Sequence, residues 1–176
     1  VSTATAWIET GPVEPEPVET GPAPVVAPPE ERPPADEVSL APGRPLGTVK
    51  GAITEADGRG YLETVGESLP LFERARAVHP GQLLQLANRA LALNVALGPW
   101  VHVGSRLTHR AVLRWDEPFE VRSLVQDRFE RRGHQFVTLD VTVIGAGAVG
   151  DVPRAPRVAS QVRHTAIYRL ASKTEG

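Results

Sequence analysis

The chain has no cysteine and no methionine, and only two lysines accompany its 17 arginines. Without cysteine there is no disulfide scaffold, no zinc–thiolate site and no cysteine nucleophile. The sequence lacks a run of about 18 or more apolar residues that could span a membrane. It also lacks a basic-then-apolar secretion signal at its start. We therefore expect a cytoplasmic protein without a membrane span, whose natural translation start is not Val1.

Charge and proline are unevenly distributed along the 176 residues. Residues 1–45 hold 8 acidic and 2 basic side chains and 11 of the 17 prolines, whereas residues 46–176 hold 13 acidic and 17 basic side chains. The resulting net charge of +4 in the second part is too mild for a nucleic-acid-binding protein. The region 10–45 is rich in Pro, Glu, Gly and Ala, which favours an extended chain with little to bury. We therefore predict a disordered linker there.

The short segment before this linker reads as a strand, because Val1, Thr3 and Thr5 alternate with smaller residues. An isolated strand followed by a long linker is an unusual start for a domain. We interpret residues 1–9 as a remnant strand of an upstream domain. The expected division is then a linker over 10–45, a folded domain over 46–171 and a tail over 172–176.

The folded domain is built around one long predicted helix from Pro80 to Leu97. This helix is apolar almost all round, which requires burial on every side. Strands with alternating apolar residues precede and follow it. This order predicts an α+β fold in which a curved antiparallel sheet wraps a central helix. The expected strands are residues 46–53, 100–107, 108–115, 119–129, 135–144 and 157–170, with a turn at Asp57–Gly60 and a short helix in 61–72.

Five short stretches of the sequence, and the order in which they occur, are similar to those of one protein family. They are His79-Pro80-Gly81, Ala87-Asn88-Arg89-Ala90-Leu91, Gly98-Pro99-Trp100-Val101-His102-Val103, Glu130-Arg131-Arg132-Gly133-His134 and Val162-Arg163-His164-Thr165-Ala166-Ile167-Tyr168. Together they resemble the hotdog fold of the MaoC-like hydratase/dehydratase and thioesterase superfamily. In particular they look like the C-terminal hotdog of actinobacterial acyl-dehydratase-like proteins made of two fused hotdogs. The resemblance implies a hotdog fold, a proline-rich linker between the halves, and an acyl-CoA or acyl carrier protein thioester as substrate in fatty acid metabolism, without a cofactor.

The catalytic motif of that family is missing. MaoC-like hydratases use an Asp-x-x-x-x-His motif to activate water against an enoyl thioester. No histidine of this chain has an aspartate five positions before it. The residues found there are Arg74, Leu97, Gly104, Phe129 and Ala159. The resemblance therefore implies that the pair lies in another hotdog.

The start of the long helix is the first candidate site. Free N–H groups at a helix start, here those of Gly81 and Gln82, can hold a thioester carbonyl. The alternative is ordinary helix-start chemistry at Pro80. His79 is a candidate catalytic residue that could orient or protonate the thioester. Its alternative role is to cap the helix through a side-chain hydrogen bond.

Two further residues are candidates for substrate binding. His102 faces opposite to its strand neighbours, so it either lines the substrate channel or pairs across strands. Asn88 is polar in an apolar helix and needs partners, as does Asn94, either from sheet backbone or from a second hotdog. Three other histidines, His109, His134 and His164, are expected at solvent-facing or turn positions, so no metal site is predicted. Glu63, Glu67 and Asp57 are either thioesterase-type bases or surface carboxylates, and the burial of Asp127 and Asp140 stays open.

Three functions remain. The first is the substrate-binding half of an R-specific enoyl-thioester hydratase or dehydratase, a lyase that is not self-sufficient and takes its Asp/His pair from another hotdog. The second is an acyl-CoA thioesterase that acts as a homodimer through its own carboxylate. The third is a non-catalytic acyl-binding or dimerisation module. All three imply a homo-oligomer or a second hotdog as partner.

Overall fold

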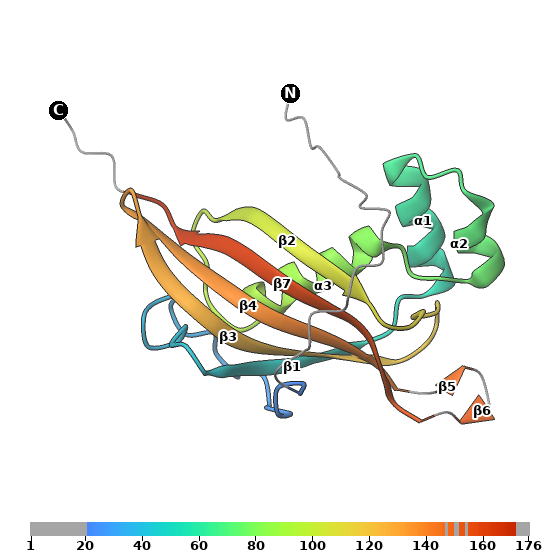
Figure 1. Cartoon of the computed structure of the whole chain (residues 1–176), viewed down its shortest axis with the longest axis horizontal. Coiled ribbons are helices and arrows are strands. Elements are labelled where there is room, and N and C mark those ends of the chain that lie inside the picture. Colours follow the sequence, from blue (N-terminus) through green and yellow to red (C-terminus); the bar gives the residue numbers. More distant parts are fainter. Residues whose placement is uncertain (1–20, 147, 150–151, 154, 172–176) are drawn as a thin grey trace.

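The molecule is a five-stranded antiparallel sheet that curves around one helix (Figure 1). The computed structural model describes residues 21–146, 148–149, 152–153 and 155–171. The predicted remnant strand, the first part of the predicted linker and the tail lie outside these residues. The strand order is β1-β3-β4-β7-β2. The elements are β1 (Pro45–Gly51), α1 (Glu55–Val65), α2 (Pro70–Ala75), α3 (Pro80–Ala92), β2 (Val101–His109), β3 (Phe119–Arg131), β4 (His134–Gly145), β5 (Ala148–Val149), β6 (Val152–Pro153) and β7 (Arg157–Arg169).

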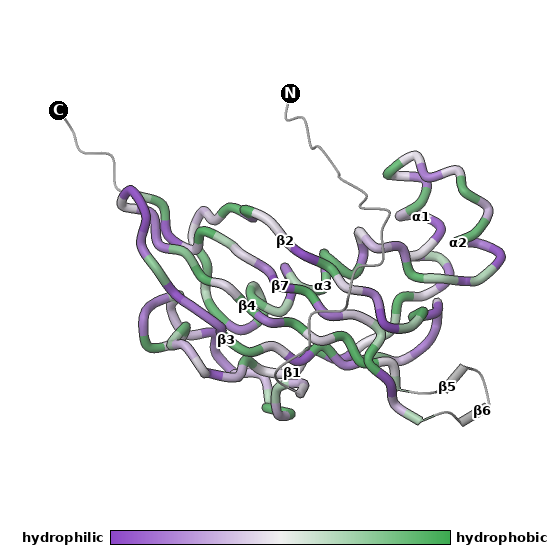
Figure 2. Tube along the Cα trace, in the orientation of Figure 1, coloured by the Kyte–Doolittle hydropathy of each residue, from purple (hydrophilic) through white to green (hydrophobic). Residues whose placement is uncertain are grey.

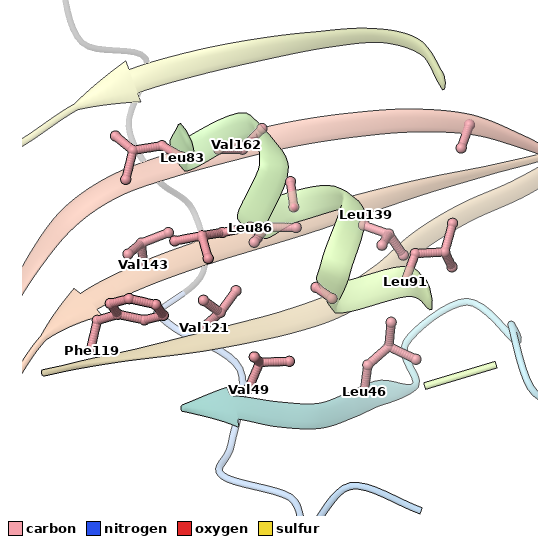
Figure 3. Close-up of a cluster of buried hydrophobic side chains, with 14 of the residues drawn as sticks. Leu46, Val49, Leu83, Leu86, Leu91, Phe119, Val121, Leu139, Val143 and Val162 are labelled. Atoms are coloured by element: carbon pink, nitrogen blue, oxygen red, sulfur yellow. The ribbon is translucent and has the colours of Figure 1, made fainter. Parts of the chain in front are cut away.

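The core lies between α3 and the concave face of the sheet. Alternate residues of β3, β4 and β7 point towards the helix and are buried, and Figure 2 shows hydrophobic and hydrophilic residues alternating along these strands. Leu83, Leu86 and Leu91 of α3 meet valine and leucine side chains of the sheet (Figure 3). The period of two in the strands and the apolar helix therefore meet in one core. This confirms the predicted α+β fold with a central helix.

The central helix is shorter and less enclosed than the sequence suggested. It ends at Ala92, because the Asn94 side chain takes over the next interactions: it donates to the carbonyls of Ala90 and Gly47 and accepts from the Gly47 N–H. Asn94 thereby ties the end of α3 to β1. Gln85 and Arg89 form an exposed stripe along the helix. The prediction of burial on every side is therefore wrong, since the sheet wraps only one side.

Residues 57–60 form part of a helix, and the predicted turn is wrong. Thr54 caps α1: its hydroxyl accepts from the Asp57 N–H at 3.1 Å, and the Asp57 carboxylate accepts from the Thr54 N–H at 3.2 Å. This reciprocal capping box outweighs the turn preference of Asp-Gly. Gly58 packs so closely on the Trp115 ring that a side chain there would collide with it. The glycine serves helix packing.

The proline-rich segment is docked on the domain over residues 21–44. It contains no helix or multi-residue strand, in line with its composition. Yet Leu40 of the segment is 0% exposed. Val26 of the segment forms two hydrogen bonds with Thr48 of β1: the Thr48 N–H donates to the Val26 carbonyl at 2.8 Å, and the Val26 N–H donates to the Thr48 hydroxyl at 3.2 Å. Ala96, beyond the end of α3, bonds to Pro33 and Ala35 of the segment. The prediction of a disordered linker is wrong for this part.

This docking closes one edge of the sheet. β1 is an edge strand, and the segment lies along it with Pro28 packed against the backbone of Gly47. Proline has no N–H to donate, so the segment offers no backbone donor to a further strand at Pro28. β2, at the other edge, has no second strand partner among the described residues.

Replacing Leu40 tests the docked segment. We expect Leu40→Ala to lower the free energy of unfolding by about 2–4 kcal/mol, because a fully buried leucine is lost from a packed site. Val38→Ala, two residues away at a side chain that is 68% exposed, is the control and should change it by less than about 0.5 kcal/mol. Chemical denaturation measures both. Equal, small effects would show that the segment is only loosely attached.

Candidate functional site

The start of α3 is capped by its own histidine. The Gly81 N–H donates to Nδ1 of His79 at 3.1 Å, and the Gln82 N–H donates to the His79 carbonyl at 2.9 Å. The Gln82 side chain accepts from the His79 N–H at 3.3 Å, which completes a capping box. The two N–H groups that the sequence offered to a thioester are therefore bonded within the chain. The capping role predicted as the alternative for His79 matches this geometry.

Residues of α1, α2 and the loop between them close over this helix start. The rings of Tyr61 and Phe72 lie 5.3 and 4.7 Å from the His79 ring. The Tyr61 hydroxyl occupies the space that a side chain at Gly81 would fill. Oε2 of Glu67 is 3.6 Å from Nε2 of His79. Both ring nitrogens of His79 thus face protein atoms, and the N–H groups of Gly81, Gln82 and Leu83 are all bonded to His79.

The three candidate carboxylates do not gather at one point. Glu67 reaches the helix start, where its Oε1 also accepts from the Leu69 N–H at 2.8 Å. Asp57 caps α1 instead, and Glu63 is exposed on α1. Among the described residues, no three His, Asp or Glu side chains converge as metal ligands would.

A second polar cluster lies at the beginning of β2. Nε2 of His102 is 3.0 Å from Oγ of Ser105, which is 3.0 Å from Nδ1 of His164 on β7. The two histidine rings stack at 4.8 Å between their centroids, with 19° between their planes. An irregularity in the pairing between His102 and Gly104 brings His102 and Ser105 to the same face as His164. We call these three residues the His–Ser–His cluster.

The prediction that His164 is at a solvent-facing or turn position is wrong, because its side chain is 0% exposed. The signal was present in β7, where Val162 and Ala166 are both buried and His164 stands midway between them in the alternation. His109 and His134, at the end of β2 and at the β3–β4 turn, are placed as expected.

Burial, and secondarily the nearby His102, lowers the pKa of His164 to about 4. The ring is therefore neutral at pH 7. In the described part of the chain its Nε2 has no hydrogen-bond partner, and neither has Oδ1 of Asn88 on α3. The sheet-backbone partner expected for Asn88 is thus not found for this oxygen. Buried polar atoms of this kind normally have a partner.

The sequence itself matches no family model and no curated protein. Solved structures do match. The (R)-hydratase of A. caviae involved in PHA biosynthesis is 15% identical, with a TM-score of 0.57 over 73% of this chain and 96% of that chain. The MaoC-like dehydratase from Rhodospirillum rubrum is 14% identical, with a TM-score of 0.55 over 77% and 97%. The chain has the hotdog fold. The expected likeness to MaoC-like dehydratases and R-hydratases is confirmed at the level of fold.

Two further structural neighbours come from Mycobacterium tuberculosis, and one of them was solved as a complex. The ChsH1-ChsH2 complex from Mycobacterium tuberculosis matches with 11% identity and a TM-score of 0.56, over 73% of this chain and 98% of that chain. HtdX from the same organism is 19% identical at a TM-score of 0.51; 72% of this chain aligns with only 51% of that one. No helix in the described residues is long and apolar enough to cross a membrane.

The pKa of His164 predicts an acid-sensitive stability. The unfolded chain takes up a proton at His164 near pH 6.5, whereas the folded chain does so only near pH 4. Between these values the unfolded state holds more protons, so the free energy of unfolding falls as the pH falls, by up to about 3 kcal/mol. Denaturation curves from pH 7 to 4 measure this loss.

The variant His164→Asn keeps a side-chain hydrogen-bonding group but does not titrate, so it should lose less stability over the same pH range. A direct titration of the His164 ring by NMR is the second measurement. An unchanged pH slope in the variant, or a ring that titrates near pH 6.5, would contradict the assignment of His164 as a buried neutral group.

Proposed function

We propose that this chain is one hotdog half of an acyl-thioester hydratase/dehydratase-like protein. It shapes the acyl-thioester site, and a second hotdog supplies the catalytic Asp/His pair. The observation that carries the proposal is the contrast between its closed helix start and its open β2 edge. The reaction needs no cofactor beyond the CoA or acyl carrier protein on the substrate, and we place it in the cytoplasm.

The closed helix start argues that the thioester carbonyl is held elsewhere. Both ring nitrogens of His79 face groups of this chain, and the hydroxyl of Tyr61 lies against Gly81. A ligand would have to displace this cap before it could use the Gly81 N–H. A second hotdog with an open helix start would not have this obstacle.

The open β2 edge is suited to pairing with that second hotdog. Val101 and Val103 on this strand are 45% and 51% exposed, although valines of the other strands are mostly buried. An edge strand with exposed apolar residues and free backbone groups favours addition of another strand. The structural likeness to the ChsH1-ChsH2 complex supports a paired arrangement, either of two copies or of two different hotdogs.

A thioesterase is the second candidate, and one contact favours it. Glu67 lies beside His79 at the helix start, where a carboxylate could activate water if the cap opened. The third candidate, a non-catalytic acyl-binding or dimerisation module, would bind thioesters without turning them over in any assembly.

Hydration of crotonyl-CoA tests the proposal. We expect the isolated chain to be no faster than buffer, because a positioned acid–base group contributes about 10²–10⁴-fold and the sequence lacks the Asp-x-x-x-x-His pair. Co-expression with a hotdog that carries the Asp-x-x-x-x-His motif and is encoded beside this chain should restore turnover. The control is the same assembly with that histidine replaced. Robust hydration by the isolated chain would contradict the proposal.

Thioester hydrolysis separates the two enzyme candidates. The isolated chain and its Glu67→Gln variant are compared on acyl-CoA substrates, with Glu63→Gln on the exposed face of α1 as the matched control. We expect no hydrolysis above buffer from any of them. Hydrolysis by the chain that Glu67→Gln abolishes and Glu63→Gln leaves intact would instead establish the thioesterase.

A further inference from the structure

The direction of β2 determines which part of this chain faces the site of a paired hotdog. In this chain the start of α3 lies near the end of β2: the Val78 N–H donates to the Leu113 carbonyl, and Ala77 pairs with Arg114, a few residues past His109 (Figure 1). In antiparallel pairing the end of one strand lies opposite the beginning of the other. The helix start of a hotdog paired through β2 therefore approaches Val101 and His102.

We propose that the His–Ser–His cluster binds a neutral oxygen, a hydroxyl or carbonyl, on the acyl chain of a thioester held at the helix start of the paired hotdog. This inference rests on the proposed function and adds to it the surface through which this half contacts the substrate. His102 is the contacting residue. Ser105 and His164 are positioning residues that hold its ring.

The cluster offers the ligand either a donor or an acceptor. The Ser105 hydroxyl has one proton, so it donates to one ring and accepts from the other. When it donates to His164, it accepts from Nε2 of His102, whose Nδ1 is then an acceptor. When His164 donates to Ser105, the hydroxyl donates to His102, whose Nδ1 then carries a proton. His102 can thus accept from a hydroxyl or donate to a carbonyl without a change in net charge.

The surroundings favour a neutral ligand group over an anion. His164 stays neutral at pH 7 because its pKa is about 4. The neighbouring cations Arg106 and Arg163 face each other across β2 and β7. Each lies one position from Ser105 or His164 along its strand, so both lie on the opposite face of the sheet. These two described arginines therefore do not compensate the charge of a carboxylate or phosphate on the cluster face.

His102 is accessible to such a ligand. It is exposed at the unpaired edge, and among the described residues its Nδ1 has no hydrogen-bond partner. Ser105 is half-buried and His164 fully buried, so the cluster leads from the open edge into the face that α3 covers. Nε2 of His164 also lacks a hydrogen-bond partner among the described residues, so this buried polar atom is left for a group from outside them.

The test compares two probes, 3-hydroxybutyryl-CoA and butyryl-CoA, on the co-expressed assembly by titration calorimetry. We expect the hydroxylated thioester to bind about three- to tenfold more tightly, as one neutral hydrogen bond allows. Ser105→Ala should remove this preference, and Ser105→Thr, which keeps the hydroxyl, should retain it. Thr108→Ala, on the same strand but the opposite face, is the matched control and should leave the preference unchanged.

Ring ¹⁵N NMR of His102 and His164 gives a second measurement. Ligand binding would not change their tautomer populations if the cluster only stabilised the fold. Binding of the hydroxylated probe should shift the tautomer populations of His102 and His164 together, and Ser105→Ala should uncouple them. Equal affinity for the two probes, or a preference that survives Ser105→Ala, would overturn this assignment alone. Failure of the assembly to form or to bind either probe would overturn the proposed function as well.

Discussion

An antiparallel sheet has two edges, and each edge leaves backbone hydrogen-bonding groups that must be satisfied. Most features of this molecule follow from the different ways in which its two edges are completed. The proline-rich segment covers β1 with two hydrogen bonds to Thr48 and with the buried Leu40. β2 has β7 on one side and no further strand among the described residues. On the β1 side, Asn94 also bonds the end of α3 to Gly47.

Two polar regions of the interior also differ, namely the start of α3 and the cluster at β2. The cap on the start of α3, built from His79, Gln82 and the Tyr61 ring, satisfies the donors that a hotdog enzyme would present to a thioester. At β2, by contrast, the His–Ser–His cluster includes Nε2 of His164, which is buried without a hydrogen-bond partner among the described residues. A chain that closes its own helix start and has an unpaired edge strand among its described residues is suited to complement another subunit's site.

Strand alternation, the apolar helix and the five stretches of the resemblance were sufficient to predict the α+β hotdog fold. The errors have physical causes. The capping box of Thr54 and Asp57 outweighed the turn preference of Asp-Gly. The proline-rich segment is docked by backbone hydrogen bonds and by the buried Leu40, neither of which its composition singles out. The burial of His164 was readable from its strand. Its contact with Ser105 was not, because the pairing irregularity beside Gly104 changes the alternation of β2.

We infer that this hotdog is completed by pairing through β2. Hydrogen exchange of the backbone amides, measured on the paired assembly and again after dilution, tests it most directly. We expect the β2 amides not bonded to β7 to be protected in the assembly and to exchange freely on dilution. The amides of β1 bonded to the docked segment, such as that of Thr48, should stay protected throughout. Rapid exchange along β2 in the assembly, or concentration-dependent protection at β1 instead, would contradict it.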